Sequence, residues 1–199
     1  MSSGRVFPRL GLYGGIATLA GMLSQLATYY TRFYQLKIPT AGASPQGDPI
    51  WVDSGTFGPP NVLIGDVPTT PVGAQNSTLI PAIVIQFTEF EDGSLNPMAG
   101  ESIGTVEINF CTFDNSEDRK GSEDTDNLLA TLRTMLLENR VLKGFALRAP
   151  LHGQRILETT HPLYYGTITA HYNIPQPQQV DSEEIIDPLW RAILLGEVP

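Results

Sequence analysis

One short motif in the sequence has residue types that could support nucleophilic catalysis. Residues 100–104 (GESIG) fit the G-x-S-x-G pattern of serine hydrolases, and His152, His161 and His171 all follow Ser102, as the hydrolase order requires. A nucleophile elbow needs a strand before the serine and a helix after it, whereas a Pro/Gly-containing turn precedes this serine and a strand-like segment follows it. We therefore predict that the chain is not an enzyme, with a Ser102 hydrolase as a remote alternative.

The other residues that could bind a metal or cofactor lack the spacing for it. The three histidines stand nine and ten residues apart, without the i, i+4 pairing of a helical metal site. The acidic loop from Asp114 to Asp126 lacks the residue order of a calcium loop. A lone cysteine, Cys111, excludes both an intramolecular disulfide and a Cys-based zinc site, and a small buried thiol is its expected role. We predict no metal and no cofactor.

Charge is distributed unevenly along the 199 residues, which carry 12 Lys+Arg against 21 Asp+Glu. So few basic residues disfavour tight nucleic-acid binding, because that affinity comes from lysine and arginine displacing phosphate counterions. Residues 1–47 sum to +4, residues 89–126 to −9 and residues 127–155 to +4. Neighbouring acidic and basic regions can be complementary between copies, which indicates assembly; two solvated loops and a helix face are the alternative.

The first 38 residues are predicted to form an N-terminal helix. Residues 10–31 carry no charge and are long enough to span a bilayer, but their polar residues and glycines argue against that. The strongest apolar positions recur every three to four residues, as on an amphipathic helix, so we expect no membrane role. These positions are Leu12, Ile16, Leu19, Leu23, Leu26, Tyr30 and Phe33.

Two further segments flank the expected core. Residues 39–81 contain eight prolines, six glycines and three charges, which predicts a long extended arm lying on a surface of its own or of a neighbour. Residues 177–199 are predicted to be a linker followed by a short helix, with Asp187 as N-cap, Pro188 in the first turn and Gly196 just past the end. The apolar residues of that helix need a covering surface, which could be another subunit.

The core domain is expected over residues 82–176. Strands are predicted at 82–87, 105–113, 145–151 and 163–174, and a helix of about 18 residues after an N-cap at Ser122, ending at Lys143-Gly144. In the second strand Val106, Ile108 and Phe110 alternate with polar residues, so one face is dry and the other wet. This order of elements predicts an α+β fold, with an antiparallel or mixed sheet packed by helices.

The order and spacing of these core segments carry a resemblance to a known family. The relevant features are the helix opening at residues 126–129 (DNLL) with Arg133, residues 145–151 (FALRAPL), and residues 162–166 (PLYYG) leading to a strand closed by Ile174-Pro175. Together with the strands PAIVIQF and TVEINFCTFDN, they resemble the tail terminator, or tail completion, proteins of long-tailed bacteriophages. The resemblance covers residues 79–176, and the Pro-rich arm and C-terminal helix depart from it.

The resemblance implies a structural virion protein of the tail and neck, made in the host cytoplasm. Such proteins form a homo-oligomeric ring, usually of six subunits, that caps the tail tube, ends tail polymerisation and docks on the head connector (head completion protein). DNA passes through the lumen without specific binding, and the tape measure protein is a further candidate partner. The alternative is another neck or baseplate interaction protein.

Two groups of residues are candidates for these roles. An acidic wall would repel passing DNA, so the candidate lumen or tube-facing surface comprises Asp114, Glu117, Asp118, Glu123, Asp124 and Asp126. Apolar residues of the helix, the arm and the C-terminal segment are the candidate assembly contacts, namely Leu19, Leu23, Trp51, Phe57, Leu189, Trp190 and Ile193.

Overall fold

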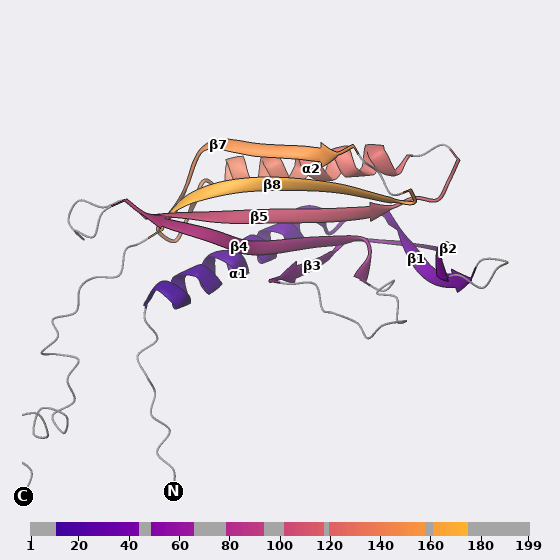
Figure 1. Cartoon of the computed structure of the whole chain (residues 1–199), viewed down its shortest axis with the longest axis horizontal. Helices are drawn as coiled ribbons and strands as arrows, with labels where there is room; N and C mark the ends of the chain where they lie inside the picture. Colours follow the sequence, from indigo (N-terminus) through magenta and orange to yellow (C-terminus); the bar gives the residue numbers. More distant parts are fainter. Residues whose placement is uncertain are drawn as a thin grey trace, which may run out of the picture.

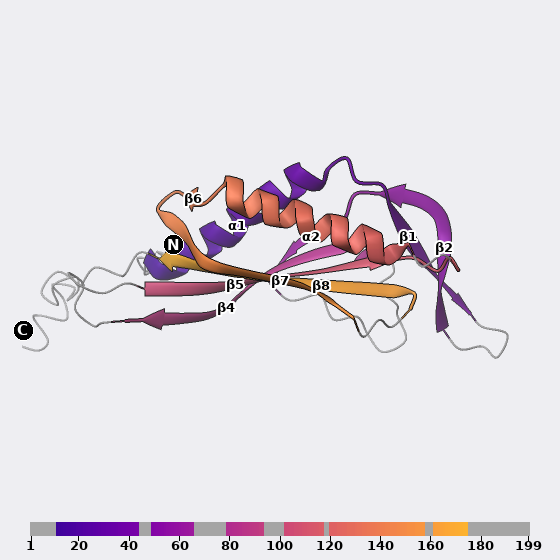
Figure 2. The same cartoon turned by 90° about the horizontal axis from the view of Figure 1, so that it is seen from above.

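A six-stranded mixed sheet with two helices on one face forms the body of the protein, which confirms the predicted α+β class. The computed structural model describes residues 11–43, 49–65, 79–93, 102–117, 120–157 and 161–174. Strand order in the sheet is β3-β4-β5-β8-β7-β6, with β3 parallel to β4 and every other pair antiparallel. Figures 1 and 2 show both helices on the same side of the sheet.

The four long strands are those expected from the sequence, and each begins close to its predicted start. They are β4 (Ala82–Asp92), β5 (Ser102–Phe113), β7 (Phe145–Ile156) and β8 (Leu163–Ile174). The predicted alternation in β5 is confirmed, because Val106, Ile108 and Phe110 are at most 2% exposed while the residues between them are partly exposed. The same alternation runs along β8, so the two central strands turn one apolar face toward the helices.

Helix α2 (Gly121–Glu138) has the predicted apolar face but different ends. Leu128, Leu132, Met135 and Leu136 are buried, as expected. The predicted N-cap at Ser122 is wrong, because the N-cap is Lys120, two residues earlier, and the helix begins at Gly121. The predicted end is also wrong: residues 143 and 144 have φ angles of 45° and 94° and form the turn between β6 (Val141–Leu142) and β7. Glycine is favoured both just past the end of a helix and in a tight hairpin turn, because both positions need a positive φ. The pair Lys143-Gly144 therefore cannot distinguish the end of a helix from a hairpin turn by sequence alone.

The predicted irregular arm is also partly wrong. Within it lie most of a two-stranded hairpin, formed by β1 (Leu36–Ala43) and β2 (Pro49–Gly58), and the short edge strand β3 (Asn61–Ile64). Pro39 stands at a register irregularity of the hairpin, where a missing N–H costs least. Residues 44–48 and 66–78 of the arm, and the whole segment 175–199 with its predicted helix, lie outside the described residues.

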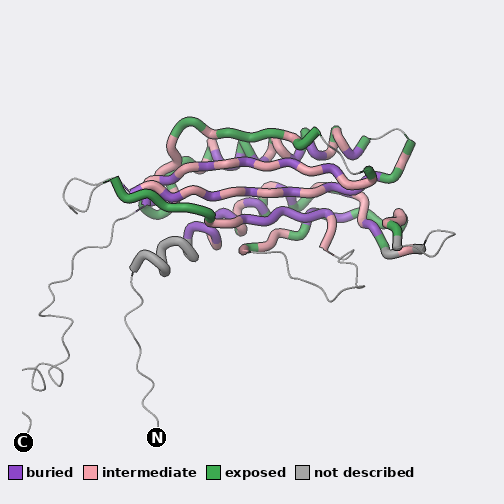
Figure 3. Tube along the Cα trace, in the orientation of Figure 1, coloured by how far each residue is buried: buried purple, intermediate pink, exposed green. Residues whose placement is uncertain are grey.

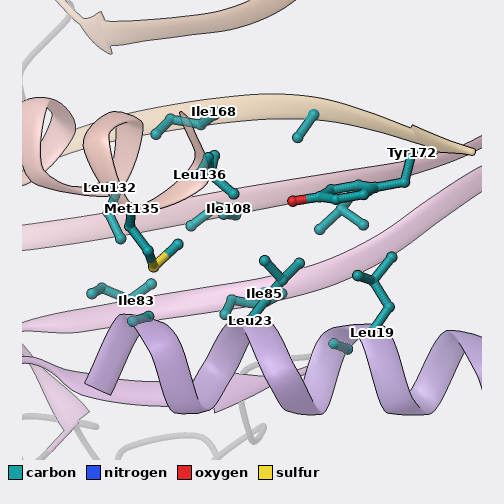
Figure 4. Packing of buried hydrophobic residues seen from close by; sticks show 14 of the residues in the cluster. Leu19, Leu23, Ile83, Ile85, Ile108, Leu132, Met135, Leu136, Ile168 and Tyr172 are labelled. Carbon is teal, nitrogen blue, oxygen red and sulfur yellow. The ribbon is translucent and has the colours of Figure 1, made fainter. Parts of the chain in front are cut away.

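Helix α1 (Gly11–Thr31) belongs to the same core as the sheet. It contacts β3, β4 and α2, and Leu19, Leu23 and Ala27 are fully buried in a cluster that also contains Ile83, Ile85 and Leu132. Figure 4 shows these side chains interleaved between the helices and the sheet. The hydrophobic core is therefore not confined to the predicted domain of residues 82–176. It also includes α1 and packs against β3, which both lie in the N-terminal third of the chain.

One polar atom in this core is unusual. The Tyr172 ring is fully buried, and its hydroxyl points into the apolar cluster without a hydrogen-bond partner among the described residues (Figure 4). Burial raises the pKa of this phenol, so it stays neutral. An unpaired buried hydroxyl costs about 1–3 kcal/mol. We expect Tyr172→Phe to raise the free energy of unfolding by about 1 kcal/mol, measured by urea denaturation; a loss of more than about 1 kcal/mol would show that the hydroxyl has a stabilising partner.

Candidate assembly surfaces

The β1–β2 hairpin is fixed to the sheet by an ion pair in which the carboxylate is buried and the lysine is half-buried. Lys37 Nζ on β1 lies 2.5 Å from Oδ1 of Asp114, which follows β5 and is 1% exposed. The Asp114 carboxylate also accepts hydrogen bonds from the Ser116 backbone N–H (3.1 Å), the Ser116 hydroxyl (2.8 Å) and the Gly121 N–H at the start of α2 (2.9 Å). One carboxylate thus joins the hairpin, the end of β5 and the first turn of α2.

These contacts set the protonation of the groups around Asp114. Burial by itself would raise the pKa of Asp114, but the hydrogen bonds from Lys37, Ser116 and Gly121 lower it to about 2. The hydrogen bond to Asp114 in turn raises the pKa of Lys37. Burial, followed by the charge of Asp114, raises the pKa of Asp124 in the first turn of α2. The pair is therefore fully ionised at neutral pH.

The candidate acidic surface divides into one structural residue and several exposed ones. Asp114 is wrongly placed on it, because a carboxylate that is buried and paired with Lys37 presents no charge to passing DNA. Glu117, Glu123 and Asp126 are exposed, and Asp126 forms an ion pair with Arg155 on β7 (2.9 Å) that ties α2 to the sheet. Asp124 is half-buried, and Asp118 lies outside the described residues. The start of α2 therefore keeps a smaller acidic surface than predicted.

The candidate assembly contacts divide in the same way. Leu19 and Leu23 were wrongly assigned, because both are 0% exposed in the core of their own chain. Phe57 on the hairpin is 54% exposed, and Trp51 is partly exposed. Leu189, Trp190 and Ile193 lie outside the described residues. Figure 3 shows the hairpin at one end of the sheet, and its exposed stretch at residues 54–57 is available for contact.

Ser102 does not have the surroundings of a catalytic nucleophile. It lies in the first position of β5, is 2% exposed, and donates a hydrogen bond to Asp92 on the neighbouring strand. His171 points to the opposite face of the sheet, where its Nδ1 lies 3.1 Å from Thr105 Oγ1. Among the described residues, Ser102 and the two motif residues after it are paired in an antiparallel ladder with β4 and β8, and a strand rather than a helix follows the serine.

The face of the sheet turned away from α1 and α2, called here the open face, carries two hollows. The larger, the apolar pocket, has a volume of about 390 Å³. Its floor is one row of cross-strand neighbours, Ala82, Cys111, Tyr165 and Ile156, from β4, β5, β8 and β7 in that order. Burial raises the pKa of the Cys111 thiol to about 12, so this cysteine is an unreactive part of an apolar wall.

The smaller hollow, the polar pocket, lies at the other end of the open face and has a volume of about 300 Å³. Its floor is a second row, in which Glu89, Thr105, His171 and Arg148 lie on β4, β5, β8 and β7. Among the described residues no group of His, Cys, Asp or Glu is placed to hold a metal ion. The two ends of the open face therefore differ in character, one apolar and one charged.

Sequence reasoning missed the Lys37–Asp114 pair and both pockets. The pair joins residues 77 positions apart, and its only signal is that Lys37 is a charged residue in a segment without acids. Each pocket needs the register of four strands, which no local pattern reveals. Neither of the two helices in the described part of the chain, at residues 11–31 and 121–138, is long and apolar enough to cross a bilayer.

Comparison with known proteins adds no further constraint. No protein-family model matches the sequence, and no curated protein matches it either.

Proposed function

We propose that this chain is a structural virion protein that forms a ring, of six subunits, at the end of a bacteriophage tail tube. The ring ends tail polymerisation and joins the tail to the head connector, and DNA passes through its lumen. The order of β4, β5, α2, β7 and β8 supports the proposal, because these elements contain the segments on which the resemblance to tail terminator proteins rests.

The surfaces of the chain are compatible with assembly. A large exposed aromatic, Phe57, projects from a hairpin that is anchored rigidly by Asp114, and an open sheet face with an apolar pocket lies beside it. Exposed apolar surface of this kind is typical of protein–protein contacts. Exposed acids at the start of α2, Glu117 and Glu123, support a lumen that does not retain DNA.

The proposal is tested by adding the purified chain to tubes assembled from the cognate tail tube protein. Negative-stain images should show a ring on one end of each tube, and capped tubes should stop growing at that end when more tube protein is added. Phe57→Glu should reduce ring formation at least about tenfold, because a charge is then desolvated in the contact. Val141→Glu is the matched control, since Val141 is 69% exposed on β6, away from the hairpin.

Two results would contradict the proposal. A chain that stays monomeric in native mass spectra when tubes are present is not a terminator ring. A ring that binds elsewhere, on the baseplate end or on a neck protein but never on the tube, would support the alternative interaction protein.

A further inference from the structure

The apolar pocket is large enough to take a side chain from another segment. Its 390 Å³ are enclosed on the open face by the row Ala82, Cys111, Tyr165 and Ile156, with Trp51 of the hairpin and Leu63 of β3 at its sides. The next residue after the row, Leu157, is 75% exposed. Such an apolar hollow is of the size that binds ligands or anchoring side chains.

The occupant is indicated by the part of this chain that follows the sheet. Residues 175–199 contain one strongly apolar stretch, residues 185–195 (IIDPLWRAILL), with the tryptophan Trp190 at its centre. These residues carry too much apolar surface to be left in water without cost, about 25 cal/mol per Å². The described residues thus leave an apolar pocket open, and the sequence contains an apolar segment that would gain from being covered.

Chain direction favours the pocket of another copy over the segment's own. Strand β8 passes the pocket at Tyr165 and ends at Ile174, about 30 Å further along at roughly 3.3 Å per residue. Pro175 favours an extended backbone at Ile174, where β8 ends pointing away from the pocket. Residues 175–188 can span at most about 50 Å, enough to cross to a neighbour in a ring, whereas a return over the roughly 30 Å to the segment's own pocket would require the chain to reverse its direction.

The chemistry of the pocket fits an indole. A buried tryptophan needs an acceptor for its N–H. Asn109, in the pocket lining, uses its amide nitrogen to donate to Gln86 Oε1 (3.3 Å), and its carbonyl oxygen is the acceptor on this amide. The remaining lining is almost wholly apolar, as the three leucines and the isoleucine of residues 187–195 require.

We propose that the apolar pocket binds residues 187–195 of an adjacent copy, with the Trp190 side chain inserted into the pocket. Each subunit of the ring would then bind the next one through this contact. The contact is head-to-tail, because the donor segment and the acceptor pocket are different surfaces, and such contacts close into rings when the rotation permits. This inference rests on the proposed ring and names the surfaces that hold it together.

Photo-crosslinking of the full-length chain tests the contact directly. A variant with p-benzoyl-phenylalanine in place of Trp190 keeps an aromatic group in the segment. Equal amounts of the unlabelled and the nitrogen-15-labelled variant are mixed, unfolded and refolded together. The refolded sample is then irradiated. Mass spectrometry should find crosslinks from position 190 to peptides containing Trp51, Leu63 or Ile156, and about half of them should join a light chain to a heavy one. The same photoreactive residue at Gln178, in the linker, is the control and should give at least about tenfold fewer crosslinks to these peptides.

A second variant addresses the pocket without touching the segment. Ile156, at the end of the row that forms the pocket floor, is 41% exposed, so Ile156→Glu should leave the fold intact while reducing the crosslinks at least about tenfold. Val141→Glu should leave them unchanged. Crosslinks only within one chain, or only to other surfaces, would overturn the inference, and if rings still cap tubes the proposed function would stand. Absence of rings and of crosslinks would overturn both.

Discussion

Replacing Asp114 with asparagine is expected to lower the free energy of unfolding by about 3 kcal/mol. The change removes the closer of the two carboxylates beside Lys37, whose side chain is 25% exposed, and leaves only Asp53 Oδ2 at 3.9 Å. It also weakens the hydrogen bonds from Ser116 and the Gly121 N–H. Breaking one half of a buried pair costs roughly 3–5 kcal/mol, and the partial exposure of Lys37 places this pair at the lower end. Urea denaturation followed by circular dichroism gives the value.

Glu117→Gln is the matched control for this variant. It removes one carboxylate three residues away, but Glu117 is exposed, so its free energy of unfolding should change by less than about 0.5 kcal/mol. If the two variants were equally stable, Asp114 would not be the anchor of the hairpin.

The Lys37–Asp114 pair also predicts how stability depends on pH. The pKa of Asp114 is about 2 in the folded chain against 3.8 without its partners, so the folded state favours the ionised form. A carboxylate whose pKa is lowered on folding stabilises the fold at pH values above its unfolded pKa. This stabilisation, roughly 2 kcal/mol, is lost as the pH falls from about 4 to about 2. The difference in unfolding free energy between the wild type and Asp114→Asn should therefore shrink over this interval. A difference that stays constant down to pH 2 would contradict the assignment.

Local periodicity was sufficient to predict the elements that contribute most to the core. In β5 and β8 every second residue is buried, and in α2 the buried residues recur every three to four positions, so these elements carry their own signal. The hairpin β1–β2 carries no such signal. It is held by Lys37 and by its own ladder rather than by a continuous apolar face, so its sequence reads as an irregular, proline-rich arm.

The errors in the candidate sites have one physical cause, which is that charge and apolarity in a sequence do not reveal what each side chain contacts. Asp114 lies in a strongly acidic stretch of the sequence, yet it is buried and paired with Lys37, which is 77 residues away. The apolar pocket could not be predicted at all, since Ala82, Cys111, Tyr165 and Ile156 are adjacent only through the register of four strands.

Leu23→Ala is expected to lower the free energy of unfolding by about 3 kcal/mol, which decides between the two roles considered for Leu23. A leucine to alanine change in a core costs roughly 2–5 kcal/mol, through lost transfer free energy and the cavity that remains. Leu23 is 0% exposed and belongs to the cluster with Ile83 and Ile85 beneath α1 (Figure 4). Gln25→Ala, on the exposed side of the same helix, is the control and should change stability by less than about 0.5 kcal/mol.

The dependence on protein concentration separates a core residue from an assembly contact. Stability that comes from association rises with concentration by mass action, whereas stability from packing within one chain does not. The loss in Leu23→Ala should thus be the same at about 1 µM protein and at about 50 times that concentration. A loss that appears only at the higher concentration would return Leu23 to the contacts between copies, and would mean that α1 packs on the sheet of its own chain less tightly than its burial indicates.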